Sequence, residues 1–204
     1  MTGISTLLLF GGLAPRLLVQ AGNTVSPEAA AGEGSALEMA VEDALAQLRA
    51  GAIATYSDTP DVDFAATLSR HDAAIAGLAR AAGHGVADRR LRQAASRLAA
   101  AAATRLRLLR DWQSRKASVW VVSGSSVPIR FAESRLRQTL ARLPRGDAPS
   151  DFAGIAACIC HRALDLARIE LELGRDPQMK GMAASLATEA AATITEMDDW
   201  LWAR

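Results

Sequence analysis

The chain has 204 residues, half of them hydrophobic, with only 4% aromatic residues and a net charge of +1. This balance excludes an overall electrostatic attraction to nucleic acid or to anionic membranes, so any charged partner must recognise a local cluster. Two cysteines are too few for a disulfide framework. The alanine-rich composition with few β-branched runs favours an all-α fold.

The N-terminal segment, residues 1–35, is expected to be a flexible leader. Ile4–Ala14 is an apolar run of signal-peptide length, and Val19–Ala21 and Ala29–Ala31 offer small residues for cleavage. No Lys or Arg precedes the run, and Pro15–Arg16 interrupts it. The run is too short to predict a transmembrane helix. We therefore expect a periplasmic or secreted protein, with a cytoplasmic protein that has a disordered leader or a wrongly placed start codon as the alternative.

The first structural unit is expected at residues 36–116 and contains three helices. They are a short helix over Ala36–Ala50, a long helix that Asp61 or Asp63 caps and Gly83–Gly85 ends, and a second long helix from Asp88 to about Lys116. Apolar residues recur at helical spacing in both long helices. They are Phe64, Leu68, Ile75, Leu78, Ala79 and Ala82 in one, and Leu91, Leu98, Ala102, Leu106, Leu109 and Trp112 in the other. Two long helices joined by so short a turn are antiparallel.

A linker over residues 117–130, which can hold one short extended piece, separates this unit from a second at residues 131–204. The second unit is expected to contain a short helix over Phe131–Leu143, a long helix that Asp151 caps and that runs to about Leu173, and a last helix after the turn at Gly174–Pro177. The apolar stripe of the last helix is formed by Met179, Met182, Leu186, Ala190, Ile194, Met197 and Leu201.

The two units are copies of one another. Asp63–Trp112 returns without a gap as Asp151–Trp200. Identical pairs include Asp63/Asp151, Phe64/Phe152, Leu78/Leu166, Arg80/Arg168, Asp88/Asp176 and Trp112/Trp200. An internal duplication of this kind predicts one core built jointly. Two helical hairpins with one apolar face each bury those faces against each other as a four-helix bundle, with a short helix before each hairpin.

Several stretches resemble a known family. Asp61–Phe64, followed by His71, Ala74 and Leu78–Ala79, is similar to the D-V-D-F…M-I-P-H-H-Q-x-A-x-x-M-A motif of the family of domain-of-unknown-function number 305, the CopM-like group. The second copy resembles the later half of the family in Ala167–Pro177 and Ile194–Leu201. The resemblance covers roughly residues 36–204 and implies a ferritin-like fold. It also implies an exported protein that binds copper or a related metal through histidines and methionines.

The family pattern is altered at its ligand positions. His71 holds the first histidine position of copy one, but Asp72 replaces the second, and Leu68 and Leu78 replace both methionines. In the second copy, Ile159 and Cys160 stand at the two histidine positions, Cys158 replaces the proline, and His161 replaces the glutamine, while Ala156 and Leu166 replace the methionines. Met197 remains at its family position. The family's metal site therefore cannot be transferred intact.

A core metal site is one hypothesis for what remains. His71 lies within the apolar stripe of its helix, and Met197, Met182 and Met179 lie on the stripe of the last helix. Neutral imidazole and thioether ligands suit Cu(I). The alternative is a core histidine that is hydrogen-bonded to a backbone or carboxylate partner among gap-filling methionines. We expect Asp72, next to it, to be solvated.

The cysteines offer a second set of ligands. Cys158 and Cys160 point roughly 160° apart on an intact helix, so they cannot chelate one ion or form a disulfide there. Cys158 and His161 are neighbours on the outer side and can bind Cu(I) or Zn(II) as a two-ligand surface site. Two ligands are too few for a closed structural site. The alternative is an incidental exposed pair beside a cysteine at the edge of the core.

The second long helix carries a basic cluster, which consists of Arg89, Arg90, Arg92, Arg97, Arg105, Arg107, Arg110, Arg115 and Lys116. No interleaved aromatic residues or nucleic-acid motifs accompany it, so we expect the arginines to be solvated or paired with acidic neighbours such as Glu189 and Glu196. No nucleophile elbow, P-loop or dinucleotide fingerprint occurs, and the di-iron Glu-x-x-His pattern is absent. The sequence predicts no enzyme, no nucleic-acid partner and no stable membrane span.

Two hypotheses for the function follow from these patterns. The first is a non-enzymatic, exported helical bundle that binds copper or zinc through an altered site centred on His71 and Met197. The second is a structural or protein-interaction module that has lost metal binding.

Overall fold

The computed structural model describes residues 27–50, 56–116, 126–143 and 145–204. Within these ranges the chain forms six helices and no strand, so the fold is all-α, as predicted. The helices are α1 (Pro27–Ala50), α2 (Pro60–Gly85), α3 (Arg89–Lys116), α4 (Val127–Arg142), α5 (Ala148–Leu173) and α6 (Pro177–Trp202). None of the helices in the described part of the chain has the length and apolar character needed to cross a membrane.

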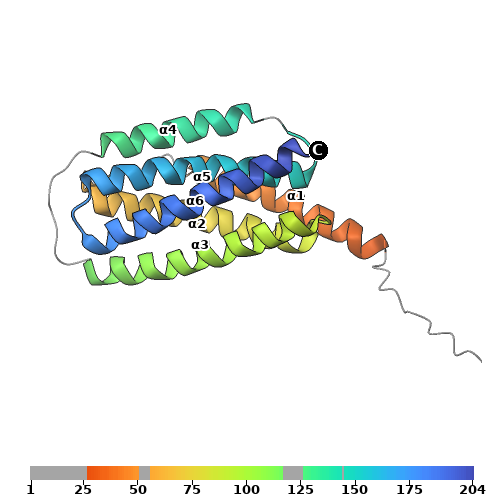
Figure 1. The fold of residues 1–204 in the computed structure, drawn as a ribbon, viewed down its shortest axis with the longest axis horizontal. Coiled ribbons are helices and arrows are strands. Elements are labelled where there is room, and N and C mark those ends of the chain that lie inside the picture. Colours follow the sequence, from red (N-terminus) through yellow and green to blue (C-terminus); the bar gives the residue numbers. More distant parts are fainter. Residues whose placement is uncertain (1–26, 51–55, 117–125, 144) are drawn as a thin grey trace, which may run out of the picture.

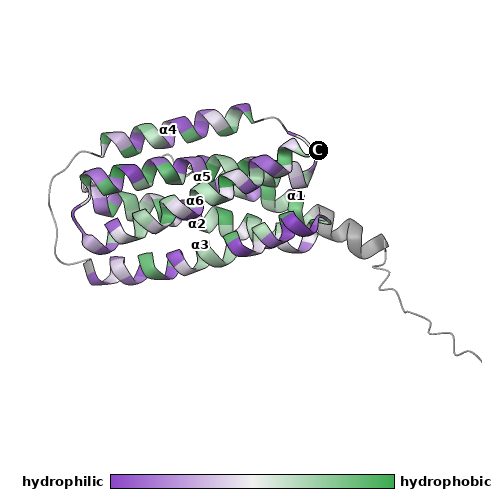
Figure 2. Ribbon diagram, viewed as in Figure 1, coloured by the Kyte–Doolittle hydropathy of each residue, from purple (hydrophilic) through white to green (hydrophobic). Residues whose placement is uncertain are grey.

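The helices pack as two hairpins with one additional helix on each (Figure 1). α2 packs along α3, and α5 packs along α6, in both cases antiparallel. The hairpins meet mainly through α2 and α5, whereas α3 and α6 touch much less. α1 lies against α2, and α4 lies against α5. Apolar and polar stripes run along the helices in Figure 2, as expected for amphipathic helices around a shared core.

The predicted stripes form most of the core. Phe64, Leu78 and Ala79 are fully buried in α2, and Leu109 and Trp112 are buried in α3. In α6 the stripe residues from Met179 to Met197 are buried, with Met179 and Met197 at 0% exposure. Leu106 and Leu201, which lie at the edges of their stripes, are only half-buried.

Several helix boundaries differ from the prediction. α1 begins at Pro27 rather than at Ala36, because proline suits the first turn and Ala29–Ala31 are strong helix formers. α4 begins at Val127, with proline in its first turn, so residues 127–130 are helical and do not belong to the linker. The extended piece expected in that linker falls on residues 117–125, outside the described ranges.

Aspartates cap α3 and α6, and the caps of α2 and α5 differ from the prediction. The Asp88 carboxylate accepts a hydrogen bond from Leu91 N at 2.8 Å, and Asp176 accepts from Gln178 N at 2.9 Å. α5 is capped by Asp147, which accepts from Ser150 N, and not by Asp151. α2 has Thr59 at its N-cap position without a side-chain cap bond.

The aspartates expected to cap α2 and α5 hold the preceding loops instead. Asp63 is buried and accepts hydrogen bonds from Ser57 N at 2.8 Å and from the Ser126 hydroxyl, which precedes α4. Asp151, which aligns with Asp63 in the predicted repeat, is also buried and accepts a hydrogen bond from Gly146 N at 2.8 Å. Both aspartates therefore turn back to the chain before their own helix.

Candidate functional site

A cleft of about 220 Å³ is lined by residues of α2, α3, α5 and α6. It lies between α3 and α6, which pack only loosely against each other. Alanine and aliphatic side chains form most of its walls. Its polar residues are His71, Asp72, Arg97, Arg105, Cys160, Glu189, Thr193 and Glu196. The cleft therefore brings together His71 and Cys160, two of the predicted metal ligands.

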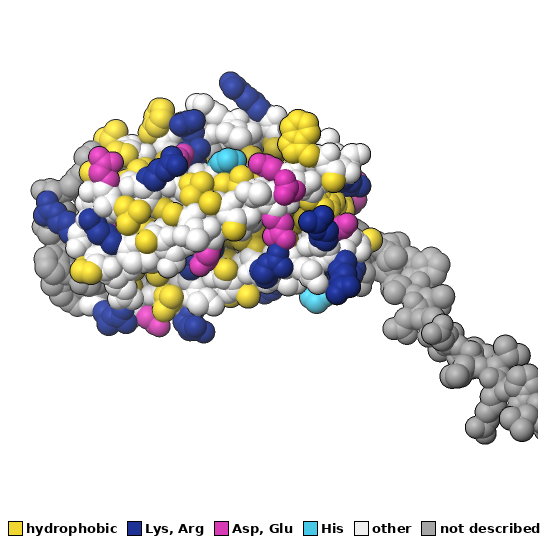
Figure 3. All heavy atoms as spheres, in the orientation of Figure 1, with side chains coloured by type: hydrophobic (Ala, Val, Ile, Leu, Met, Phe, Trp, Pro, Cys, Tyr) yellow, Lys and Arg dark blue, Asp and Glu magenta, His cyan; other side chains and the backbone are white. Residues whose placement is uncertain are grey.

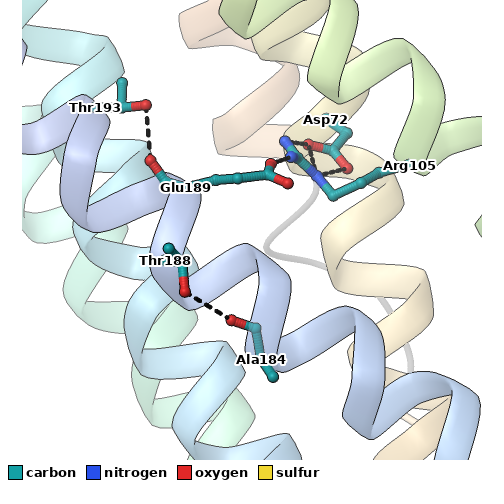
Figure 4. A network of polar contacts seen from close by, with 6 residues as sticks. All are labelled: Asp72, Arg105, Ala184, Thr188, Glu189 and Thr193. Carbon is teal, nitrogen blue, oxygen red and sulfur yellow. Dashed lines mark hydrogen bonds and ion pairs between the residues drawn. The ribbon is translucent and has the colours of Figure 1, made fainter.

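The main polar connection across the cleft joins Asp72, Arg105 and Glu189 (Figure 4). Arg105 donates from Nη2 to Asp72 Oδ1 at 2.8 Å and from Nε to Oδ2 at 3.1 Å. Its Nη1 donates to the Glu189 carboxylate of α6. Burial lowers the pKa of Arg105, but Asp72 and Glu189 outweigh this effect and raise it, so the guanidinium stays charged.

The expectation that Asp72 is solvated is wrong. Asp72 is only 2% exposed. Burial raises the pKa of its carboxyl group, although the hydrogen bonds and the positive charge of Arg105 act to lower it. The spacing explains the position: Asp72 follows Leu68 by four residues and precedes Ile75 by three, so it lies on the buried face of α2. Arg105 lies between Ala102 and Leu109 on the buried face of α3 in the same way.

His71 contacts a buried carboxylate of α4. Its Nε2 lies 2.8 Å from Glu133 Oε1 of α4, and both side chains are buried. This contact is close enough for an ion pair, although its angle is not that of a linear hydrogen bond. Arg70 lies 3.9 Å from the same carboxylate. Burial raises the pKa of Glu133, but His71 and Arg70 outweigh it and hold the pKa below its ordinary value. Within the described residues, His71 Nδ1 has no hydrogen-bond partner.

The cysteines are free and differ in their surroundings. Cys160 is buried at the cleft, and burial raises the pKa of its thiol to about 12. Cys158 is half-buried, and burial raises its pKa as well. His161 is exposed on the surface of α5. The thiol of Cys160 therefore stays protonated at neutral pH, whereas metal binding requires the thiolate.

The methionines of α6 are in the core but not at the cleft. Met182 and Met197 are buried in α6, and neither lines the cleft that His71 and Cys160 share. Within the described part of the chain, no group of three or more His, Cys, Asp or Glu side chains is arranged to hold a metal ion.

Two arginines of α3 pair with acidic residues of α6, which is one of the two outcomes expected for the basic cluster. Arg97 donates to both carboxylate oxygens of Glu196, at 2.5 and 2.7 Å, and Arg105 pairs with Glu189. Arg115 donates to Gln178 instead. On the face shown in Figure 3, basic and acidic side chains are interspersed and form no single basic patch.

Two buried carboxylates were missed from the sequence. Glu133 follows Ile129 by four residues and precedes Leu136 by three, so it interrupts an apolar stripe. Glu170 follows Leu166 by four residues in α5 and is fully buried. In both cases the sequence contains a charged residue at a position of the apolar stripe, and this pattern could have identified the buried carboxylate.

Comparison with known proteins finds no match: no protein-family model, no curated protein and no solved structure is significantly similar to this chain. The resemblance to the family of domain-of-unknown-function number 305 therefore stays a prediction.

Proposed function

We propose that this protein is a non-enzymatic helical module with a structural or protein-interaction role, in which the family's ligand positions have become internal polar contacts. One observation carries the proposal. His71 and Asp72 occupy the two histidine positions of copy one, and they contact Glu133 and Arg105 respectively. Both side chains are thus committed to partners within the protein.

The proposed architecture is a ferritin-like four-helix bundle of α2, α3, α5 and α6 that arose by duplication. Equivalent positions of the two copies support it. In the sequence repeat, Asp72 and Arg105 of the first hairpin correspond to Cys160 and Thr193 of the second. All four residues line the same cleft.

The donors near the cleft do not fit Cu(I) or Zn(II). The Nε2 atom of His71 faces Glu133, and the Cys160 thiol would have to lose a proton whose pKa is about 12. The thioethers of Met182 and Met197 lie outside the cleft lining. A metal site would require these residues to exchange their present contacts for a new arrangement.

Titration with Cu(I) and with Zn(II) tests the proposal. We expect the wild-type protein to take up neither ion stoichiometrically, and His71→Ala and Met197→Leu to behave like it. Stoichiometric Cu(I) uptake that both substitutions weaken would instead establish the altered metal site. Export is a separate part of the proposal and rests on the sequence alone, and mass spectrometry of the mature N-terminus tests it.

A further inference from the structure

The two outer helices, α1 and α4, occupy similar places in the fold. α1 packs on α2, the first helix of one hairpin, and α4 packs on α5, the first helix of the other. The two outer helices also contact each other. Arg145, which follows α4, donates a hydrogen bond to the Glu42 carboxylate of α1 at 2.7 Å. α1 and α4 are therefore neighbours at the protein surface.

The exposed side of α1 is acidic. Leu37, Val41 and Leu45 are buried, and Met39 projects on the opposite side, where it is 61% exposed. Exposed acidic residues flank Met39 along the helix, and together with it they form the acidic strip: Glu38, Met39, Glu42 and Asp43. Glu42 pairs with Arg145, whereas Glu38 and Asp43 have no ion-pair partner among the described residues. Their negative charge therefore faces solvent.

The exposed side of α4 is basic. The helix contains four arginines and one glutamate, and this glutamate, Glu133, is buried. Phe131 is 65% exposed, and the spacing of the helix places two arginines on the same side, so that the basic strip consists of Phe131, Arg135, Gln138 and Arg142. Within the described part of the chain, Arg135 and Arg142 have no ion-pair partner. This strip thus has the charge that the acidic strip lacks.

Two neighbouring strips of opposite charge form a patch that can be complementary to itself. A two-fold axis between two molecules brings the same patch of both together, so such an interface requires self-complementarity. Rotation about this axis can place the acidic strip of each copy on the basic strip of the other. Two helix-on-helix contacts then form, and they bury twice the area of one. An anionic membrane suits the patch less well, because the acidic strip beside the arginines would be repelled by it.

We propose that this protein forms a two-fold symmetric dimer in which the acidic strip of α1 from each copy packs on the basic strip of α4 from the other. Aromatic, methionine and arginine side chains, which are enriched at protein interfaces, lie along these strips, with Met39 on one and Phe131 on the other. The inference rests on the protein-interaction role proposed above and names a second copy of the chain as the partner.

Sedimentation equilibrium of the full chain tests for the dimer. We expect the mass to rise from 21.5 kDa to twice this value, with a Kd of about 100 µM or below in about 50 mM salt. Because the paired charges lie at the surface, about 500 mM salt should weaken the dimer at least tenfold. A wild-type protein that stays monomeric up to about 1 mM would overturn the proposal.

Charge reversal on each strip identifies the interface. One variant combines Glu38→Arg with Asp43→Arg, and the other combines Arg135→Glu with Arg142→Glu. Each variant alone places like charges opposite each other and should be monomeric, whereas an equal mixture restores both contacts and should form a one-to-one dimer that native mass spectrometry detects. Recovery of the dimer in the mixture also shows that both variants are folded.

The matched control reverses two exposed arginines of α3, Arg107→Glu together with Arg110→Glu, and should leave the Kd unchanged. Dimers that persist in either strip variant, or a mixture that stays monomeric, would contradict the proposed interface. Binding of a monomeric wild type to phosphatidylglycerol vesicles, lost on reversal of Arg135 and Arg142, would assign the basic strip to a membrane instead. Failure of the dimer leaves the proposed function open to its own test, since His71 and Met197 lie outside both strips and metal uptake is measured separately.

Discussion

Glu170 is expected to make the stability of this protein fall as the pH rises. The residue is 0% exposed at the end of α5, and neither carboxylate oxygen has a hydrogen-bond partner among the described residues. Burial, together with the nearby Asp61 carboxylate, raises the pKa of Glu170 from 4.5 to about 9. Asp61 itself accepts hydrogen bonds from Arg175 N and Asp176 N at 3.0 and 2.8 Å, so its negative charge is held beside Glu170.

The direction of this pH dependence follows from the protonation of Glu170 in the folded and in the unfolded chain. Below pH 4.5 the carboxyl group is protonated in both the folded and the unfolded chain, and its full contribution to stability is present. Between pH 4.5 and about 9 the unfolded chain loses this proton and the folded one keeps it. Stability then falls by about 1.4 kcal/mol per pH unit from this group, which amounts to roughly 3 kcal/mol at pH 7.

Glu170→Gln tests this reasoning, because glutamine has nearly the same shape and no proton to lose. Urea unfolding at pH 4.5, 6, 7 and 8 would measure the free energy of unfolding of both proteins. We expect similar values at the lowest pH and an advantage of about 3 kcal/mol for the variant at pH 7. Glu172→Gln, at an exposed position of α5, controls for the loss of one negative charge. Parallel curves for the wild type and Glu170→Gln would refute the argument.

Three further predictions concern stability and use the free energy of unfolding as the measurement. Arg105→Met leaves Asp72 as an unpaired buried charge and should lower the free energy of unfolding by about 3–5 kcal/mol. The double variant Arg105→Met/Asp72→Leu should recover most of this loss. A double variant that is as unstable as Arg105→Met alone would contradict the importance of the ion pair. Gly174→Ala should destabilise by about 2 kcal/mol or more, because its Cβ would lie 2.5 Å from the Glu170 carbonyl oxygen, whereas Gly181→Ala has nothing within 4 Å and should stabilise α6 by up to about 1 kcal/mol. Asp147→Ala removes the cap of α5 and should cost about 1 kcal/mol at pH 7; since hydrogen bonds from Ser150 and Arg204 lower the pKa of Asp147 to about 2, this difference should vanish only as the pH falls toward 2.

The helices were predictable because each one carries its own signal. Apolar spacing placed the long helices, and Asp88 and Asp176 marked the starts of α3 and α6. Pairing of α3 arginines with acidic residues such as Glu196 was also among the expected outcomes, because two exposed helix faces of opposite charge need only a favourable rotation to meet. These features depend on local sequence or on long, mobile side chains.

The contacts of the cleft were not predictable in the same way. His71 was matched with methionines of α6, yet its Nε2 atom contacts Glu133 of α4, a helix that packs on α5. Periodicity states which face of a helix is buried but not which of several helices covers it. Asp72 was assigned to solvent because of its charge, although its spacing from Leu68 already placed it on the buried face. For buried polar residues, position in the stripe was a better guide than residue type.

His71 and Asp72 together connect α2 with three other helices. Successive residues on a helix point about 100° apart, so the pair reaches in two directions from α2. His71 reaches α4, and Asp72 reaches Arg105 of α3 and, through it, Glu189 of α6. A bound metal ion would join helices by attracting ligands from each of them. Here two adjacent side chains join the hairpins through contacts with buried partners inside the protein, and these contacts need no metal ion.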